Sequence, residues 1–174
     1  MHSVQKFVRV YSLRSRRVSK SAVKDGQETQ ETQETDIELE NATMETPLFS
    51  LAGRTVLGKI VKVVDGDSLH IVFRVEGTLK RFLCRLQGVD TPEKHSEVRI
   101  ERERALSATE AVSNLVMNKV LTIVTGKFEK FGRLLVDVRV DCEGSGKLSS
   151  LSEYLVTNNL GRSYDGGHKD DWTF

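Results

Sequence analysis

The residues best suited to chemistry are carboxylates in two short stretches, DGDSL (65–69) and RLQGVDTPE (85–93). Both stretches place acids where an apolar run begins or ends: Asp65, Asp67, Asp90 and Glu93. If the two strand ends meet, like-charge repulsion would require protons or a cation to relieve it. Hard oxygen donors, without Cys or His residues at zinc spacing, favour Ca²⁺ or Mg²⁺ over a transition metal.

Two arginines could bind the anion on which such a site would act. Arg85 shares strand parity with Arg81 and Gln87, and Arg133 shares it with Asp137 and Arg139, so both leave the apolar rows of their strands. A guanidinium is a planar donor that suits the nonbridging oxygens of a phosphodiester, which become more negative in the transition state. Two arginines beside a carboxylate-bound cation would therefore suit phosphodiester chemistry.

Each of these features has a plainer explanation when it is taken alone. DGD is an ordinary turn sequence, and TPE is an ordinary entry to a helix. Either arginine by itself is explained as a solvated strand residue. Only the combination of both acidic stretches with both arginines favours a functional site.

Five short strands would position these residues. Apolar alternation and turn residues predict strands at 56–65, 67–76, 79–88, 119–126 and 132–140. A hairpin turn at 76–78 contains the glycine that such turns require. Asp67 has the same parity as the inward-facing Leu69 and Ile71, so we expect its carboxylate, half desolvated, at the mouth of a barrel.

Two helices complete the predicted fold. The stretch 95–104 is too charged to be buried, and small apolar residues then recur at helical spacing through about Asn118. A short helix is predicted over 147–158, ending at Asn158-Asn159, because asparagine tolerates the left-handed conformation that often ends a helix. Five strands with a helix between the third and the fourth is the order of an oligonucleotide-binding barrel (OB-fold), a mainly β fold with α-helices (α+β).

The composition suits one folded domain with one extension. The 174 residues carry a net charge of +1, which gives no bulk electrostatic argument for a nucleic-acid partner. Cys84 and Cys142 are too few for a disulfide framework, so we expect free thiols. No window approaches the ~18 apolar residues that cross a bilayer, and we expect a soluble, intracellular protein.

Residues 1–50 have the composition of a tail, and residues 51–174 have that of the domain. Residues 1–24 hold seven Lys or Arg and no acid, whereas residues 25–50 hold eight Asp or Glu and no base. The QET repeat at 27–36 cannot bury enough apolar surface to offset the entropy of ordering, so the tail is predicted to be disordered. Its basic, Ser-rich beginning resembles an organellar transit peptide, but a disordered basic arm explains it as well.

Residues 56–165 resemble the staphylococcal nuclease family. The motifs that carry the resemblance are DGDSL (65–69), RLQGVDTPE (85–93), KFGRLLVDV (130–138) and NNLGRSYDGGHK (158–169). The resemblance implies an oligonucleotide-binding barrel that uses Ca²⁺, with Mg²⁺ less favoured, to hydrolyse phosphodiester bonds. Its substrates would be DNA and RNA, cleaved to leave 3′-phosphate ends. We expect an endonuclease that acts as a monomer on single-stranded or denatured nucleic acid and has no membrane partner.

The resemblance also assigns roles at the metal. Asp67 and Asp90 would bind the metal through their side chains and Thr91 through its carbonyl, with Asp65 nearby. Glu93 would orient or deprotonate the attacking water.

The remaining implied roles concern the substrate. Arg85 and Arg133 would grip the phosphate, while Lys130 and Tyr164 would help to bind the nucleotide by charge and stacking. The chain departs from the family pattern at three points. Ser68 occupies a position where the family usually has threonine, and Phe131 occupies one where tyrosine is common. The C-terminal helix of the best-known members is absent.

Two other interpretations stay open. The barrel could bind nucleic acid or peptide without catalysis, as do family members that have lost their acidic residues, or it could be purely structural. The sequence favours a metal-dependent phosphodiesterase, because a barrel that only binds nucleic acid has no need for an anionic mouth that repels phosphate. The fold alone would not decide between them.

Overall fold

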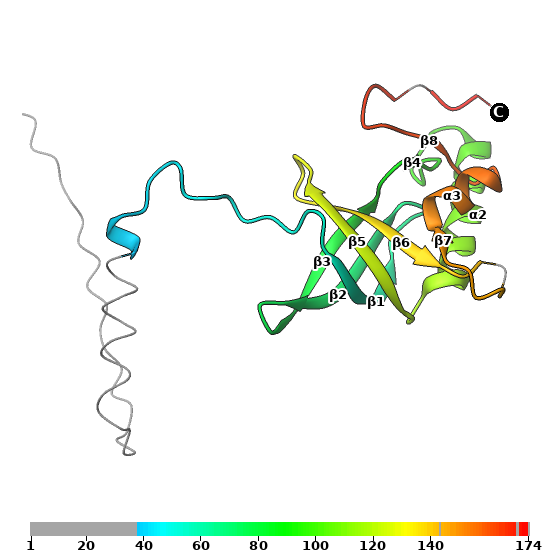
Figure 1. Ribbon diagram of the computed structural model, residues 1–174. Coiled ribbons are helices and arrows are strands. Elements are labelled where there is room, and N and C mark those ends of the chain that lie inside the picture. Colours follow the sequence, from blue (N-terminus) through cyan, green and yellow to red (C-terminus); the bar gives the residue numbers. More distant parts are fainter. Residues whose placement is uncertain (1–37, 143, 170, 174) are drawn as a thin grey trace, which may run out of the picture. The chain divides into compact units, whose positions relative to one another are not determined.

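Five strands close into a barrel (Figure 1). The structure, a computed structural model, describes residues 38–142, 144–169 and 171–173. The barrel strands are β1 (Thr55–Val63), β2 (Ser68–Val75), β3 (Thr78–Leu86), β5 (Val120–Phe128) and β6 (Leu134–Val140). They pair in the order β3-β2-β1-β5-β6, and a parallel pairing of β3 with β6 closes the ring. The predicted oligonucleotide-binding barrel is confirmed.

Alternation of side chains along the strands builds the interior of the barrel. In β2, Leu69, Ile71 and Phe73 are at most 2% exposed. The turn from β2 to β3 passes through Glu76 and Gly77, whose φ angles of 49° and 77° are the left-handed values that a two-residue hairpin loop requires. Because this pattern is regular, the predicted strand limits lie within two residues of the observed ones.

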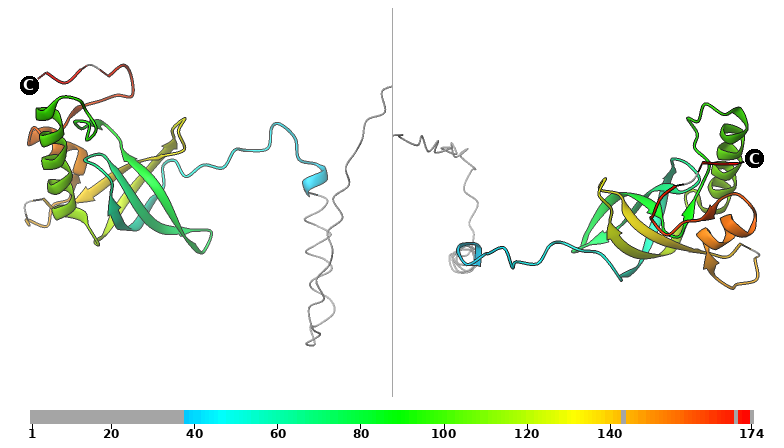
Figure 2. Two further views of the ribbon diagram at one scale, coloured as in Figure 1. Left: turned by 180° about the vertical axis from the view of Figure 1, so that it is seen from behind. Right: turned by 90° about the horizontal axis from the view of Figure 1, so that it is seen from above.

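The two longer helices lie at one end of the barrel (Figure 2). The first, α2 (Arg99–Val116), buries Ala105, Ala108 and Val112 at the spacing that predicted it. Small side chains on this stripe let the helix approach the strand connections closely.

The short helix α3 (Leu151–Thr157) begins later than predicted. Residues 149–150 form the short strand β7 (Ser149–Ser150), which pairs with β6 before the helix starts. A capping box between Ser150 and Glu153 fixes the first turn of α3. Asn159 has a φ of 55°, so the predicted left-handed end of the helix is confirmed.

A separate two-stranded sheet ties the end of the chain to the mouth of the barrel. The strand β4 (Val89–Asp90) pairs with β8 (Arg162–Ser163), so that Asp90 lies opposite Arg162. Neither strand was predicted, because two residues are too short for a hydrophobic period. Gly161 permits this pairing, since a Cβ there would lie 2.7 Å from Val89 Cγ2 and 2.9 Å from the carbonyl oxygen of Asp90.

The predictions for the tail fall largely outside the described residues. The basic region 1–24 and half of the acidic region 25–50 belong to residues 1–37. The described residues 38–50 are exposed. Residues 48–174 group into one compact unit. In the part of the chain that is described, no helix is both long and apolar enough to span a membrane.

Candidate active site

The two acidic strand ends meet at one guanidinium. Arg85 Nη1 lies 2.5 Å from Asp67 Oδ2, and Arg85 Nη2 lies 3.2 Å from Asp90 Oδ1. All three side chains are nearly inaccessible, with exposed fractions of 7% or less. The arginine is therefore not a solvated strand residue, and Asp67 lies deeper than the half-desolvated position expected for it.

Sheet register and one glycine bring these residues together. Ser68 pairs with Arg85 across β2 and β3, which places Asp67 beside the arginine. The connection to β4 is equally close, because a Cβ on Gly66 would lie only 2.8 Å from Thr91 Cγ2 and 3.0 Å from Ala108 Cβ. Any larger residue at position 66 would therefore push the two acidic loops apart.

Burial destabilises the charged form of the Asp67 carboxylate. Desolvation raises the pKa of Asp67 to about 6; Arg85 opposes this, and the charge of Asp65 adds to it. For the arginine, burial acts to lower the pKa, but the charges of Asp67 and Asp90 outweigh burial and raise it. Arg85 thus does not fully offset the cost of burying the Asp67 charge, and a further cation beside Asp67 would relieve it.

Glu93 lies at the open side of this cluster, where water can reach it. Its side chain is 66% exposed. Glu101 anchors the backbone of this loop, because its carboxylate accepts hydrogen bonds from Glu93 N at 3.0 Å and from Ser96 Oγ at 2.5 Å. The prediction that 95–104 is too charged to be buried is wrong for Glu101, which is 8% exposed, because these donors satisfy its carboxylate.

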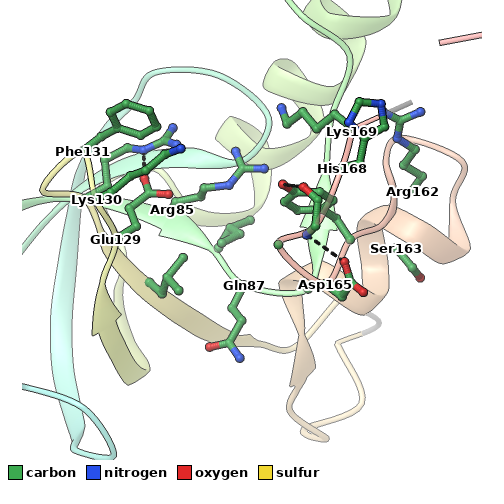
Figure 3. A pocket seen from close by; sticks show the side chains of 17 residues that line it. Arg85, Gln87, Glu129, Lys130, Phe131, Arg162, Ser163, Asp165, His168 and Lys169 are labelled. Atoms are coloured by element: carbon green, nitrogen blue, oxygen red, sulfur yellow. Dashed lines mark hydrogen bonds and ion pairs between the residues drawn. The ribbon is translucent and has the colours of Figure 1, made fainter. Parts of the chain in front are cut away.

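Two adjoining cavities collect the predicted site residues except Asp90, which lines a third cavity of about 680 Å³. A cavity of about 360 Å³ is lined by the acidic loops and their neighbours, including Asp65, Asp67, Thr91 and Glu93. A larger one of about 1300 Å³ lies between the turn after β5 and the C-terminal segment and is lined by Lys130 and Tyr164, among others (Figure 3). Residues that line both cavities include Arg85 and Arg133.

The substrate-side residues are oriented by local contacts. Arg133 forms an ion pair with Glu129, and Figure 3 shows Glu129 across the cavity from the C-terminal segment. The guanidinium carbon of Arg85 lies 5.7 Å from the centre of the Tyr164 ring, whose hydroxyl donates to the carbonyl of Gly167 at 2.8 Å. The exposed Lys130 lies over the Phe131 ring instead of contacting the acids.

Two cations of the site were missed by the sequence analysis. Arg162 Nη2 lies 3.1 Å from Asp90 Oδ2, and Lys169 Nζ lies 2.6 Å from Asp90 Oδ1. Both belong to the C-terminal segment, for which the sequence analysis singled out only Tyr164. The Asp165-Gly166-Gly167 turn was the one signal that this segment folds back toward the barrel.

The side chains of the site supply part of the oxygen ligands that a hard divalent cation needs. Within the described residues, no group of three or more Asp, Glu, His and Cys side chains is arranged to hold a metal ion. Asp67 and Asp90 supply two buried carboxylates, so a cation there would also need carbonyl oxygens, such as that of Thr91, and waters. Ca²⁺ accepts such mixed oxygen ligands, and burial, which raises the pKa of Asp67, penalises the charged form that a bound cation would stabilise.

Fold and site together define a small closed barrel whose mouth joins buried carboxylates to arginines. Among known families, the model described as "Staphylococcal nuclease homologue" matches residues 83–171, about half of the chain. The chain belongs to this family. The matched range includes Arg85, Asp90 and Glu93, whereas Asp67 precedes it and joins the site through the contact with Arg85.

A similar curated protein comes from an archaeon. It is the uncharacterized protein MJ1439 of Methanocaldococcus jannaschii, 30% identical over 127 residues. The similarity covers 62% of this chain and 58% of the archaeal protein, so this chain spans little more than half of its relative.

Proposed function

We propose that the protein is a Ca²⁺-dependent endonuclease that hydrolyses phosphodiester bonds of DNA and RNA and leaves 3′-phosphate ends. The observation that carries the proposal is the buried cluster of Asp67 and Asp90 around Arg85, beside a cavity that Arg133 and Glu93 also line. A barrel with a purely structural role has no reason to bury Asp67 with an incompletely compensated charge.

Each of these side chains has a chemical task in the proposed reaction. Arg85 from β3 and Arg133 from the turn before β6 line the cavity and would donate to the nonbridging phosphate oxygens, where negative charge grows. Glu93, exposed but fixed through its backbone, would orient a water for in-line attack and accept its proton. The water oxygen bonds to phosphorus as the bond to the 5′ oxygen breaks, and solvent protonates that oxygen.

The metal would be held by Asp67, Asp90 and the carbonyl of Thr91. When bound, Ca²⁺ supplies positive charge that stabilises the phosphate and promotes ionisation of the attacking water. The ion pair of Arg133 with Glu129 indicates that Arg133 must exchange a carboxylate for the phosphate when substrate enters. Arg133 is 27% exposed, so this exchange needs little rearrangement.

Hydrolysis of heat-denatured DNA and of RNA tests the proposal. We expect degradation with Ca²⁺ and none after a chelator is added, and the products should be extended by a polymerase only after phosphatase treatment. Glu93→Gln should lower turnover by a factor of roughly 10² at nearly unchanged substrate affinity. Glu97→Gln, which removes an exposed acid from the same loop, is the matched control.

Three outcomes would count against this function. Cleavage that persists in the chelator would exclude the metal. An unchanged rate for Glu93→Gln would remove Glu93 from the mechanism. Binding of single-stranded nucleic acid without any cleavage would favour the barrel that only binds.

A further inference from the structure

The C-terminal loop, residues 164–169, brings a lysine back to the acidic cluster. β8 leads the chain past Asp90, and the loop then reverses at an Asx turn in which Gly167 N donates to Asp165 Oδ1 at 2.9 Å. The Tyr164 hydroxyl closes the same turn on the carbonyl of Gly167. Figure 3 shows Lys169 and His168 on the side of the cavity opposite Lys130.

The ammonium of Lys169 bridges the acid proposed to bind metal and the acid proposed to orient water. It lies 2.6 Å from Asp90 Oδ1 and 3.2 Å from Glu93 Oε1. A lysine is charged at neutral pH, so its ammonium already neutralises the Asp90 oxygen that a divalent cation needs.

Of the three cations on Asp90, Lys169 is the one that can leave. The side chain of Arg85 is 7% exposed and that of Arg162 is 29% exposed, whereas that of Lys169 is 40% exposed. Arg85 is also tied to Asp67, and the guanidinium of Arg162 lies 4.3 Å from the ring centre of Trp172. A lysine on a flexible stem loses less when it moves into water than either arginine would.

We propose that Lys169 is a built-in competitor for the cation site: it occupies Asp90 and Glu93 in the absence of metal and must leave Asp90 when a divalent cation binds. This inference rests on the proposed function, because the cation is the one proposed for catalysis. Asp90 Oδ1 already faces both Arg85 and Lys169, so the ammonium would repel a divalent cation that approaches this carboxylate, and Lys169 weakens metal binding. It thereby raises the Ca²⁺ concentration that is needed to fill the site.

Calorimetric titration with Ca²⁺ tests the competition directly, without substrate. Lys169→Gln should bind Ca²⁺ with a Kd about three- to tenfold lower than that of the wild type, as expected for loss of a partly exposed ion-pair partner. Lys169→Arg keeps the charge and should bind close to the wild-type value. Lys147→Gln removes one charge from an exposed residue beyond the far end of β6 and should not tighten binding.

Trp172, the single tryptophan, gives a second signal. Its ring lies against Arg162 near the point where Lys169 reaches Asp90, so its emission should change as Ca²⁺ displaces the lysine. Emission from Lys169→Gln without Ca²⁺ should already resemble that of the Ca²⁺-bound wild type.

The outcomes separate this inference from the proposed function. Equal or weaker Ca²⁺ affinity in Lys169→Gln would overturn the competition while the metal-dependent function stands. Absence of Ca²⁺ binding in both proteins would overturn both.

Discussion

The buried carboxylate of Asp67 makes a sharp prediction about stability and pH in metal-free protein. Folding raises the pKa of Asp67 from 3.8 to about 6. Since the folded state binds this proton more tightly than the unfolded state, the contribution of Asp67 to stability is fully present below about pH 4. It is lost as the pH rises through about 6. A shift of about two units corresponds to at most about 3 kcal/mol in the free energy of unfolding.

Asp67→Asn should remove this part of the pH dependence, because the amide resembles the protonated acid. In chelator, we expect the variant and the wild type to have similar stability near pH 4. At pH 7.5 the variant should be more stable by up to about 3 kcal/mol. Urea unfolding at several pH values measures this difference. Glu110→Gln, an exposed acid on α2, is the control for the change in charge.

Addition of Ca²⁺ at pH 7.5 completes the experiment. The ion should stabilise the wild type, since it places positive charge beside the ionised Asp67. It should stabilise Asp67→Asn much less. Parallel pH profiles for the variant and the wild type in chelator would refute the claim that burial of this carboxylate is incompletely compensated.

The other predictions concern positioning. Arg133→Lys should lower kcat/KM by about 10² or more, because an ammonium cannot replace a bidentate guanidinium; steady-state kinetics would show it, and a change below threefold would contradict the role. Glu101→Ala should lower kcat and cost about 1–3 kcal/mol of stability, because two donors lose their acceptor; unchanged kcat in a stable variant would show that the Glu93 loop does not need this anchor. Gly66→Ala should reduce Ca²⁺ affinity measured by calorimetry, since its methyl group would contact Thr91 and Ala108; wild-type affinity would contradict the close-approach argument.

The barrel could be predicted from the sequence because its signals are local. Alternation in β2 and the Glu76-Gly77 turn locate a hairpin within a few residues. The helical spacing of alanines predicts α2 in the same way. The short strands β4 and β8 depend on pairing between residues about 70 positions apart, and no local pattern indicates such a pair.

The acidic part of the candidate site was predictable, and its cations were predictable only in part. Parity placed Asp67 on the inward row of β2, and the turn after β3 placed Asp90 next to it. From parity alone, Arg85 lies on the face of β3 opposite the apolar row. The parallel pairing of β3 with β6 nevertheless buries this end of the strand. Lys169 and Arg162 reach Asp90 through a chain reversal, so their contribution appears only in three dimensions.

A crystal structure with Ca²⁺ and a nucleotide 3′,5′-bisphosphate would test the central claim most directly. The account predicts one cation bound by Asp67 and Asp90, with Arg85 and Arg133 donating to the phosphate between them and Lys169 withdrawn from Asp90. A cation bound elsewhere, or a phosphate that neither arginine contacts, would contradict it.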